Sequence, residues 1–285
     1  DMVGEFPELQ GIMGRYYALH DGLPAEIADA IEDHYKPRFA GDELPRGNVG
    51  LCVALADKLE TLAGMFGIGQ LPTGDKDPFA LRRHALGVIR MLSERDLPLD
   101  LAWLFKAAQV ADEKVAGQLA DFVYERLAGS LRDQGYSALE VEAVVGLRPQ
   151  RLGDIPKRLA AVRAFAALPE AASLAAANKR VGNILKKAEG TVVANVAAAL
   201  LKEEAEVALK AALDAVKAQA DAAFERGDYA ASLQSLAALK TPVDAFFDTV
   251  MVNAADTALR NNRLGLLAIL HQAMNRVADI SRLSA

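Results

Sequence analysis

The sequence pattern that most constrains this chain is a long apolar stripe near its end. Between residues 256 and 281, apolar side chains recur every three to four positions, which is the spacing of one face of an α-helix. The stripe consists of Leu259, Leu266, Leu267, Leu270, Ala273, Met274, Val277 and Ile280. Residues 242–251 repeat the pattern and begin with a proline, whose missing N–H costs nothing at a helix start. Alternating strand-like runs are hard to find, so the sequence predicts an all-α fold.

The rest of the chain also reads as helices separated by Gly and Pro signals. We expect further helices within residues 1–19, 24–36, 48–66, 77–92, 100–132, 139–147, 152–167, 169–188, 194–225 and 229–239. Residues 194–225 form one long helix or two that are broken near Lys202. Residues 133–137 resemble a turn at a domain edge, so we predict one domain over residues 1–135 and a second over residues 136–285.

Charge is distributed unevenly along the chain. The net charge is −6, so there is no overall attraction for nucleic acid or for an anionic membrane. Residues 1–100 hold 10 Lys/Arg and 17 Asp/Glu, a net of −7, whereas residues 139–190 hold 9 and 5, a net of +4. Contact with RNA therefore has to be local, and the basic segment is the better candidate for it.

Cysteine content and hydropathy indicate the cellular compartment in which the protein works. Cys52 is the single cysteine, which excludes an internal disulfide and a cysteine-rich zinc site, and its apolar surroundings predict a buried thiol. No signal-peptide pattern and no apolar run of membrane-spanning length appears in residues 1–285. We expect a cytoplasmic protein with no membrane partner.

The strongest basic cluster lies within residues 177–187. At about 100° per residue, its polar side chains share one arc of roughly 120° on a helix, opposite the apolar residues of the segment. The arc consists of Lys179, Arg180, Asn183, Lys186 and Lys187. One interpretation is an ordinary solvated helix face, and the other is a contact for RNA phosphates.

Two pairs of arginines lie where a helix is expected to begin. Arg260 and Arg263 occupy the first turns of the terminal helix, where the macrodipole disfavours cations by roughly 0.3–1 kcal/mol. An anionic partner offsets that cost; the alternative is a pair between Arg260 and Asp256 on the helix surface. Arg82 and Arg83 begin another helix in the same way, and either a phosphate or the neighbouring aspartates are their predicted partners.

Four residues of the first half suggest a metal site of the HD superfamily. His20, Asp21, His34 and Asp57 are residues of the kind whose nitrogen and oxygen atoms bind a divalent cation for phosphate hydrolysis, and they are the candidates for such a site. The alternative is that they never converge, because His20 and Asp21 precede a loop.

Several strings closely resemble the bacterial glycyl-tRNA synthetase β subunit, over nearly the whole chain. The DALR motif of its anticodon-binding domain corresponds to residues 256–260, which read DTALR with one extra residue. The other strings are GEFPELQG at 4–11, PRFAGD at 37–42, ADKL at 56–59, FGIG at 66–69, GDKDPFALRR at 74–83, ANKR at 177–180, NIL at 183–185, PVDAFFD at 242–248, ALRNNRLGLL at 258–267 and VADIS at 277–281.

The resemblance implies an HD-like helical domain followed by an α-helical anticodon-binding bundle. It implies the C-terminal part of the β subunit of an α2β2 glycine–tRNA ligase, which recognises the anticodon region of glycine tRNA. The α subunit would carry the ATP- and Mg-dependent adenylate chemistry, so we expect no catalytic site and no cofactor in this chain. The alternatives are a metal-dependent HD-type nucleotide phosphohydrolase and a helical scaffold without an RNA partner.

Overall fold

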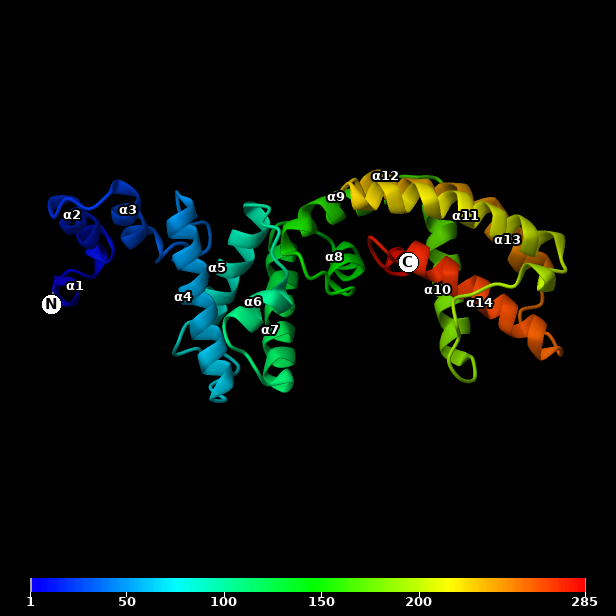
Figure 1. The fold of residues 1–285 in the computed structure, drawn as a ribbon, viewed down its shortest axis with the longest axis horizontal. Helices are drawn as coiled ribbons and strands as arrows, with labels where there is room; N and C mark the ends of the chain where they lie inside the picture. The colour runs from blue at the N-terminus through cyan, green and yellow to red at the C-terminus, as the bar shows by residue number, and fades with distance from the viewer. Residues whose placement is uncertain (1, 285) are drawn as a thin grey trace. The chain divides into compact units, whose positions relative to one another are not determined.

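The computed structural model describes residues 2–284. Its regular elements within this range are helices, and the only β-type pairings there are isolated bridges (Figure 1). The predicted all-α class is confirmed. The chain divides into two compact units. Unit 1 runs to Gln134 and includes Pro149–Asp154; unit 2 comprises Gly135–Arg148 and the chain from Ile155 onward. From the sequence, residues 149–154 were predicted to lie in the second domain. In the structure this segment joins unit 1, because the Leu101 N–H donates to the Gln150 carbonyl at 2.9 Å and Leu152 is fully buried.

Unit 1 is built on three helices, α4, α5 and α7, which pack against one another. Its elements are α1 (Met2–Glu5), η1 (Pro7–Leu9), α2 (Ile12–His20), α3 (Ala25–Asp33), α4 (Asn48–Gly67), α5 (Leu81–Glu94), α6 (Leu101–Ala107), α7 (Glu113–Asp133) and η2 (Leu152–Asp154). Leu62, Met91 and Leu92 are fully buried in the core. The continuous helix expected over residues 1–19 is wrong, because Pro7 begins a 3-10 turn and Gly11 adopts φ +79°.

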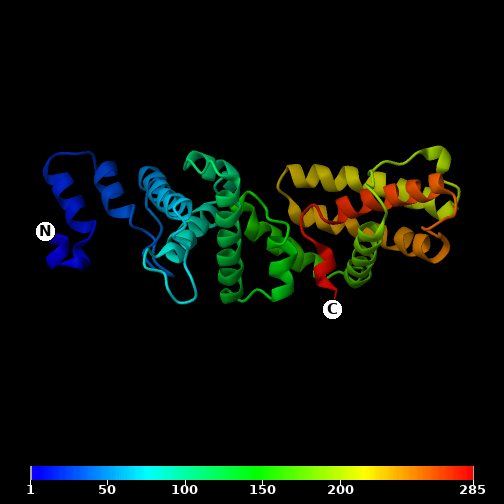
Figure 2. The ribbon, with the colours of Figure 1, turned by 90° about the horizontal axis from the view of Figure 1, so that it is seen from below.

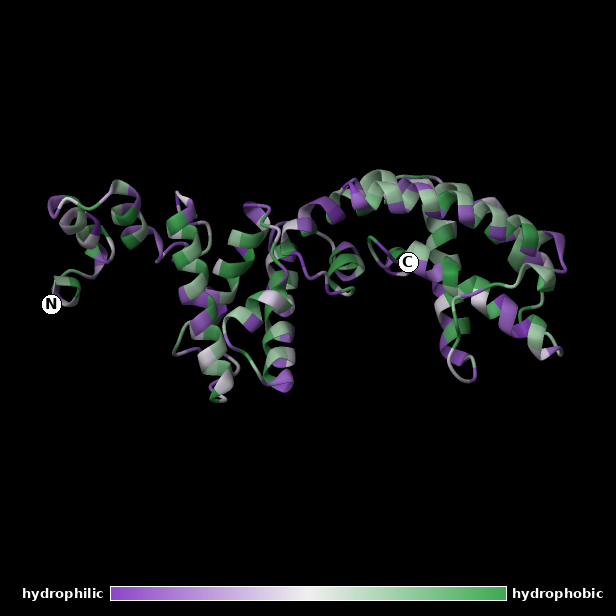
Figure 3. Cartoon of the chain, in the orientation of Figure 1, coloured by the Kyte–Doolittle hydropathy of each residue, from purple (hydrophilic) through white to green (hydrophobic). Residues whose placement is uncertain are grey.

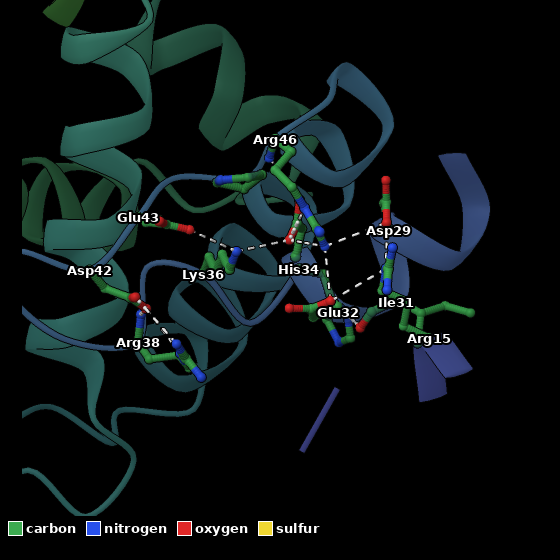
Figure 4. A network of polar contacts seen from close by, with 12 residues as sticks. Arg15, Asp29, Ile31, Glu32, His34, Lys36, Arg38, Asp42, Glu43 and Arg46 are labelled. Carbon is green, nitrogen blue, oxygen red and sulfur yellow. Dashed lines mark hydrogen bonds and ion pairs between the residues drawn. The ribbon is translucent and has the colours of Figure 1, made fainter. Parts of the chain in front are cut away.

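A network of ion pairs fixes the connection between α3 and α4, and Figure 4 shows Arg46 and Lys36 within it. The buried Asp33 carboxylate accepts the Arg46 backbone N–H at 2.7 Å and lies 3.2 Å from Lys36 Nζ. Asp42 accepts the backbone N–H of Arg38 at 2.8 Å and its Nε at 3.0 Å. Burial raises the pKa of Asp33, but the hydrogen bonds from Arg46 and Lys36 outweigh it and lower that pKa.

Unit 2 packs its helices around α10, α11 and α14 (Figure 2). Its elements are α8 (Ala138–Val145), α9 (Ile155–Ala166), α10 (Ala171–Lys187), η3 (Ala198–Leu200), α11 (Glu204–Glu225), α12 (Tyr229–Gln234), η4 (Ser235–Leu239), α13 (Lys240–Thr249), α14 (Thr257–Met274) and η5 (Ile280–Leu283). Figure 3 shows polar and apolar patches alternating along these helices, as the amphipathic spacing predicts. Phe165, Phe246 and Leu266 are fully buried.

The terminal helix is shorter than its apolar stripe predicts. It ends at Met274, where the Asn275 side-chain amide donates to the His271 carbonyl at 2.7 Å and satisfies the end of the helix. Val277 and Ile280 are still buried, but on a loop and a 3-10 turn. The helical spacing therefore marked the core residues correctly beyond the end of the helix.

Two further observations concern the surface. The predicted burial of Cys52 is wrong: its thiol lies on the exposed side of α4, because Leu51, Ala54 and Leu55 occupy the core side. No single helix within residues 2–284 is both long and apolar enough to cross a membrane.

Candidate nucleic-acid interface

Helix α10 displays the predicted basic residues on its solvent side. Lys179, Arg180, Asn183, Lys186 and Lys187 are all exposed, and we call them the α10 basic face. The opposite side of the helix carries Leu174 and Val181, both fully buried. The orientation is fixed by Asn178, whose buried amide donates to Asn275 Oδ1 at 2.8 Å and accepts from Asn275 Nδ2 at 3.1 Å.

The cations of this face lack a carboxylate partner among the described residues. No carboxylate in residues 2–284 forms an ion pair with any of the four cations of the face, and the Arg180 guanidinium instead lies 4.1 Å from the centre of the Phe247 ring. Other arginines of unit 2 do have carboxylate partners: Arg163 Nε lies 2.6 Å from Glu140, and Arg276 Nη2 lies 2.6 Å from Glu225. The unpaired positive charge of α10 is therefore available to an external anion.

A polar pocket of about 690 Å³ adjoins the C-terminal end of the α10 basic face. The end of α10 and the start of α14 form it, and we call it the α10–α14 pocket. It is lined by Ile184, Lys187, Ala188, Glu189, Asn253, Thr257, Arg260, Asn261 and Leu264. Lys187 and Arg260, predicted separately from two helices, thus meet in one place.

Arg260 is held at the pocket by the chain that precedes α14. Its Nη1 donates to the Ala254 carbonyl at 3.3 Å, and its Nη2 lies 3.4 Å from Thr257 Oγ1. The alternative partner Asp256 has another role: its carboxylate caps α14 by accepting the N–H groups of Ala258 and Leu259 at 2.7 and 3.2 Å. The amides of Asn253 and Asn261, which sequence reasoning missed, bring donors and acceptors to the same pocket.

Arg263, the other predicted contact of this helix, is buried. Its side chain is 6% exposed, its Nε donates to Glu206 Oε1 at 2.7 Å and its Nη1 donates to the Met251 carbonyl at 2.8 Å. Burial raises the pKa of Glu206, but hydrogen bonds from Arg263 and from backbone N–H groups outweigh it and lower that pKa. The anionic partner expected near the start of the helix is thus internal, and in this structure Arg263 presents no guanidinium to RNA.

Helix α14 also positions the segment that follows α10. Asn262 Oδ1 accepts the Ala197 N–H at 2.7 Å, and its Nδ2 donates to the Ala197 carbonyl at 3.3 Å. A Cβ at Gly265 would overlap the Asn195 carbonyl oxygen. This close approach was not predicted from the sequence, although an asparagine and a glycine inside a helix are signals that could have indicated it.

Arg82 and Arg83 belong to unit 1, whereas the α10–α14 pocket belongs to unit 2. The Arg83 side chain is exposed, whereas Arg82 Nη2 donates to the Gly74 carbonyl. Asp77, predicted as a possible ion-pair partner, instead accepts the N–H groups of Leu81 and Arg82 at 2.8 and 3.0 Å.

The metal candidates do not converge in the described structure. Among residues 2–284, no group of three or more His, Cys, Asp and Glu residues is placed to hold a metal ion. His20 and Asp21 are exposed at the end of α2, Asp57 is exposed on α4, and His34 Nδ1 lies 2.8 Å from the Ile31 carbonyl. The site required by the phosphohydrolase alternative does not form from these four residues.

Two models of known protein families match this chain. Residues 1–146 match the model of the glycyl-tRNA synthetase beta subunit family, and residues 174–281 match the DALR anticodon binding domain, which contains the α10 basic face and the α10–α14 pocket. The glycine–tRNA ligase beta subunits of Janthinobacterium sp. (strain Marseille) and Dechloromonas aromatica (strain RCB) are 72% and 74% identical to this chain. Each alignment covers 100% of this chain and 41% of the relative, so the chain spans about two fifths of their length. The family model matches more than half of the sequence, and the chain belongs to the glycyl-tRNA synthetase beta subunit family.

Proposed function

We propose that this chain is the tRNA-binding C-terminal portion of the β subunit of glycine–tRNA ligase, and that unit 2 recognises the anticodon region of glycine tRNA. The observation that carries the proposal is the unpaired positive charge of the α10 basic face beside a pocket that contains Arg260. A polyanion offsets the repulsion among these cations, and the cations in turn release the counterions condensed on the polyanion. The match to an anticodon-binding domain supports the same assignment.

The two parts of the interface have different roles in this proposal. Cations of the α10 basic face hold phosphates and so position the anticodon arm, without reading its sequence. The α10–α14 pocket receives an unstacked base, whose edge is recognised by the amides of Asn253 and Asn261 and by Arg260. The stacking of Arg180 on Phe247 holds one guanidinium in place before RNA binds.

The ligase reaction belongs, in this proposal, to an α2β2 assembly in the cytoplasm. The α subunit forms the adenylate with ATP and Mg²⁺, and this chain contributes RNA recognition without a catalytic site of its own. We propose in addition that unit 1 is an HD-like helical domain and that unit 2 is an anticodon-binding helical bundle.

A tRNA titration tests this function. Fluorescence anisotropy is followed as the chain is added to labelled glycine tRNA. The same measurement is made with a tRNA in which two anticodon bases are changed, namely those that pair with the two bases shared by all glycine codons. We expect tighter binding to the unchanged tRNA, several-fold weaker binding by the variant K179A/R180A, and a salt slope that falls by about one for each lost phosphate contact. The double variant Lys210→Ala and Lys217→Ala removes the same charge from α11 and serves as the matched control.

Two results contradict the proposal in different ways. Equal affinity for both tRNAs rules out anticodon reading, even where RNA binding is real. Wild-type affinity in K179A/R180A rules out the α10 basic face as the contact. The variant R260A distinguishes the pocket from the face, because it is expected to reduce the preference for the correct anticodon more than the overall affinity.

A further inference from the structure

The chain between α10 and α11 is a long irregular segment that contacts α14. It comprises residues 189–201, which contain the short 3-10 turn η3 and otherwise no helix, and we call it the strap (Figure 1). Irregular connections of this length are uncommon in compact domains, and many of them are binding loops. None of the strap's residues, all of which the structure describes, is buried, and Val193 is 70% exposed. The strap therefore has no core of its own to hold it in place.

A single side chain makes the strap's hydrogen bonds to the rest of unit 2. Asn262, on α14, is 6% exposed; its Oδ1 accepts the Ala197 N–H at 2.7 Å, and its Nδ2 donates to the Ala197 carbonyl at 3.3 Å. Among residues 2–284, no other group outside the strap forms a hydrogen bond with residues 189–201. An asparagine amide suits this position because it offers one acceptor and one donor side by side to the backbone of one residue.

The strap approaches α14 closely because residue 265 is a glycine. A Cβ at Gly265 would overlap the Asn195 carbonyl oxygen and would lie 3.1 Å from the Val193 carbonyl oxygen. Gly265 follows Asn262 by three positions, so both residues lie on the same side of α14. One side of this helix thus provides both the hydrogen bonds that hold the strap and the space in which it lies.

The strap begins at the α10–α14 pocket. Its first residue, Glu189, lines that pocket together with Arg260 and the amides of Asn253 and Asn261. Glu189 is the one carboxylate among the described residues that line the pocket, and no cation of residues 2–284 forms an ion pair with it. A carboxylate accepts hydrogen bonds from the amino group of a base, whereas Arg260 supplies donors. The position of the strap therefore decides where this acceptor lies.

The residue that follows Asn262 holds another segment of the same pocket. Arg263 Nη1 donates to the Met251 carbonyl at 2.8 Å, two residues before Asn253, and Arg263 Nε is fixed by Glu206 at 2.7 Å. Consecutive residues of α14 thus hold two segments that contribute to the pocket. Hydrogen bonds between neutral groups are weaker than charge-assisted ones, so the strap is the more easily displaced of the two segments.

We propose that Asn262 is a positioning residue for anticodon reading, which holds the strap so that Glu189 meets the edge of the bound base. The inference rests on the proposed function and goes beyond it, because Asn262 does not line the pocket and acts on the RNA through the strap. Without Asn262 the strap occupies several arrangements, and the apparent affinity for the correct base falls with the fraction of chains whose strap is in place. A merely structural role would weaken the binding of every RNA by the same factor.

The test measures RNA preference and strap order in the same variant. The whole chain is titrated with glycine tRNA and with the anticodon-changed tRNA described above, and amide hydrogen exchange is followed over residues 189–201. In N262A we expect the preference for the unchanged tRNA to fall about tenfold, because two hydrogen bonds are lost, while the affinity for the changed tRNA stays within about twofold. Exchange in the strap should become faster, whereas the buried parts of α10 and α14 keep their protection.

Three further variants separate positioning from stability. N262D keeps an acceptor for the Ala197 N–H but loses the donor to the Ala197 carbonyl, so an intermediate preference is expected. E189A should reduce the preference about as much as N262A, and E189A/N262A should lose little more than either single variant, because one residue acts through the other. S232A is the matched control: it removes the buried hydrogen bond from Ser232 Oγ to the Ala220 carbonyl, 2.9 Å long and outside the strap, and should leave the preference unchanged.

The outcomes separate this inference from the proposed function. Full preference in N262A, or equal losses of affinity for both tRNAs, overturns the inference. Additive losses in E189A/N262A also overturn it, since the two residues would then act independently. If N262A melts below the assay temperature, N262D decides, and a wild-type preference in N262D with faster exchange of the strap overturns the inference. A wild-type chain that binds both tRNAs equally overturns the proposed function, and the inference with it.

Discussion

Replacing Arg263 by alanine removes one member of a buried ion pair, which makes it the sharpest stability test. Glu206 is fully buried and would keep a negative charge without its strongest partner. Breaking a buried pair from one side typically costs 3–5 kcal/mol. Glu206 retains the backbone N–H groups of Lys202 and Glu203, at 2.9 and 2.7 Å, so we expect the lower end, about 3 kcal/mol.

The expected loss is large enough to measure by thermal unfolding. About 3 kcal/mol corresponds to a melting temperature lower by roughly 6–12 °C for a unit of this size. Circular dichroism follows the transition for the wild-type chain, R263A, E206Q and the double variant. Because the pair acts together, the double variant should lose less than the sum of the two single losses.

The pH dependence gives a second check on the same pair. Without Arg263, burial raises the pKa of Glu206, so R263A should regain stability relative to the wild type as the pH falls from 7 to 5. A melting temperature within about 2 °C of the wild type, combined with weaker tRNA binding, would refute the reasoning and restore Arg263 as an RNA contact.

Three further substitutions follow from individual contacts. A hydrogen bond from Arg38 lowers the pKa of Asp42 from 3.8 to about 2. A lowered pKa stabilises the fold at pH values above the unfolded pKa, so D42N should lose about 1–2 kcal/mol at pH 7. In urea titrations this deficit should shrink as the pH falls from 4 towards 2, through the folded pKa. G265A should lower the melting temperature, because the added Cβ meets a backbone carbonyl that cannot move aside cheaply, and an unchanged value would contradict the close approach. G117A should raise it, since no atom lies within 4 Å of its Cβ on the exposed side of α7 and alanine gains about 1 kcal/mol over glycine in a helix.

The α10 basic face could be predicted from sequence because it depends on local geometry. Residues 179–187 lie on one helix, and the period of 3.6 residues alone decides that Lys179, Asn183 and Lys186 lie on one side. The same reasoning found the buried stripe of α14. The reasoning failed at Gly11, where a positive φ interrupts the helix that the spacing predicted. It also failed at Cys52, which was predicted to be buried but lies on the exposed side of α4.

The sequence by itself therefore determined the helical class, the two amphipathic helices that form the candidate interface and the family to which the chain belongs. Only the tertiary structure decided which cations are free. Arg260 and Arg263 differ by one turn of the same helix, yet Arg260 reaches a pocket beside Lys187 while Arg263 is neutralised by Glu206 from another helix. The physical reason is that helical spacing sets the direction of a side chain, whereas burial and pairing depend on long-range packing that no local pattern specifies.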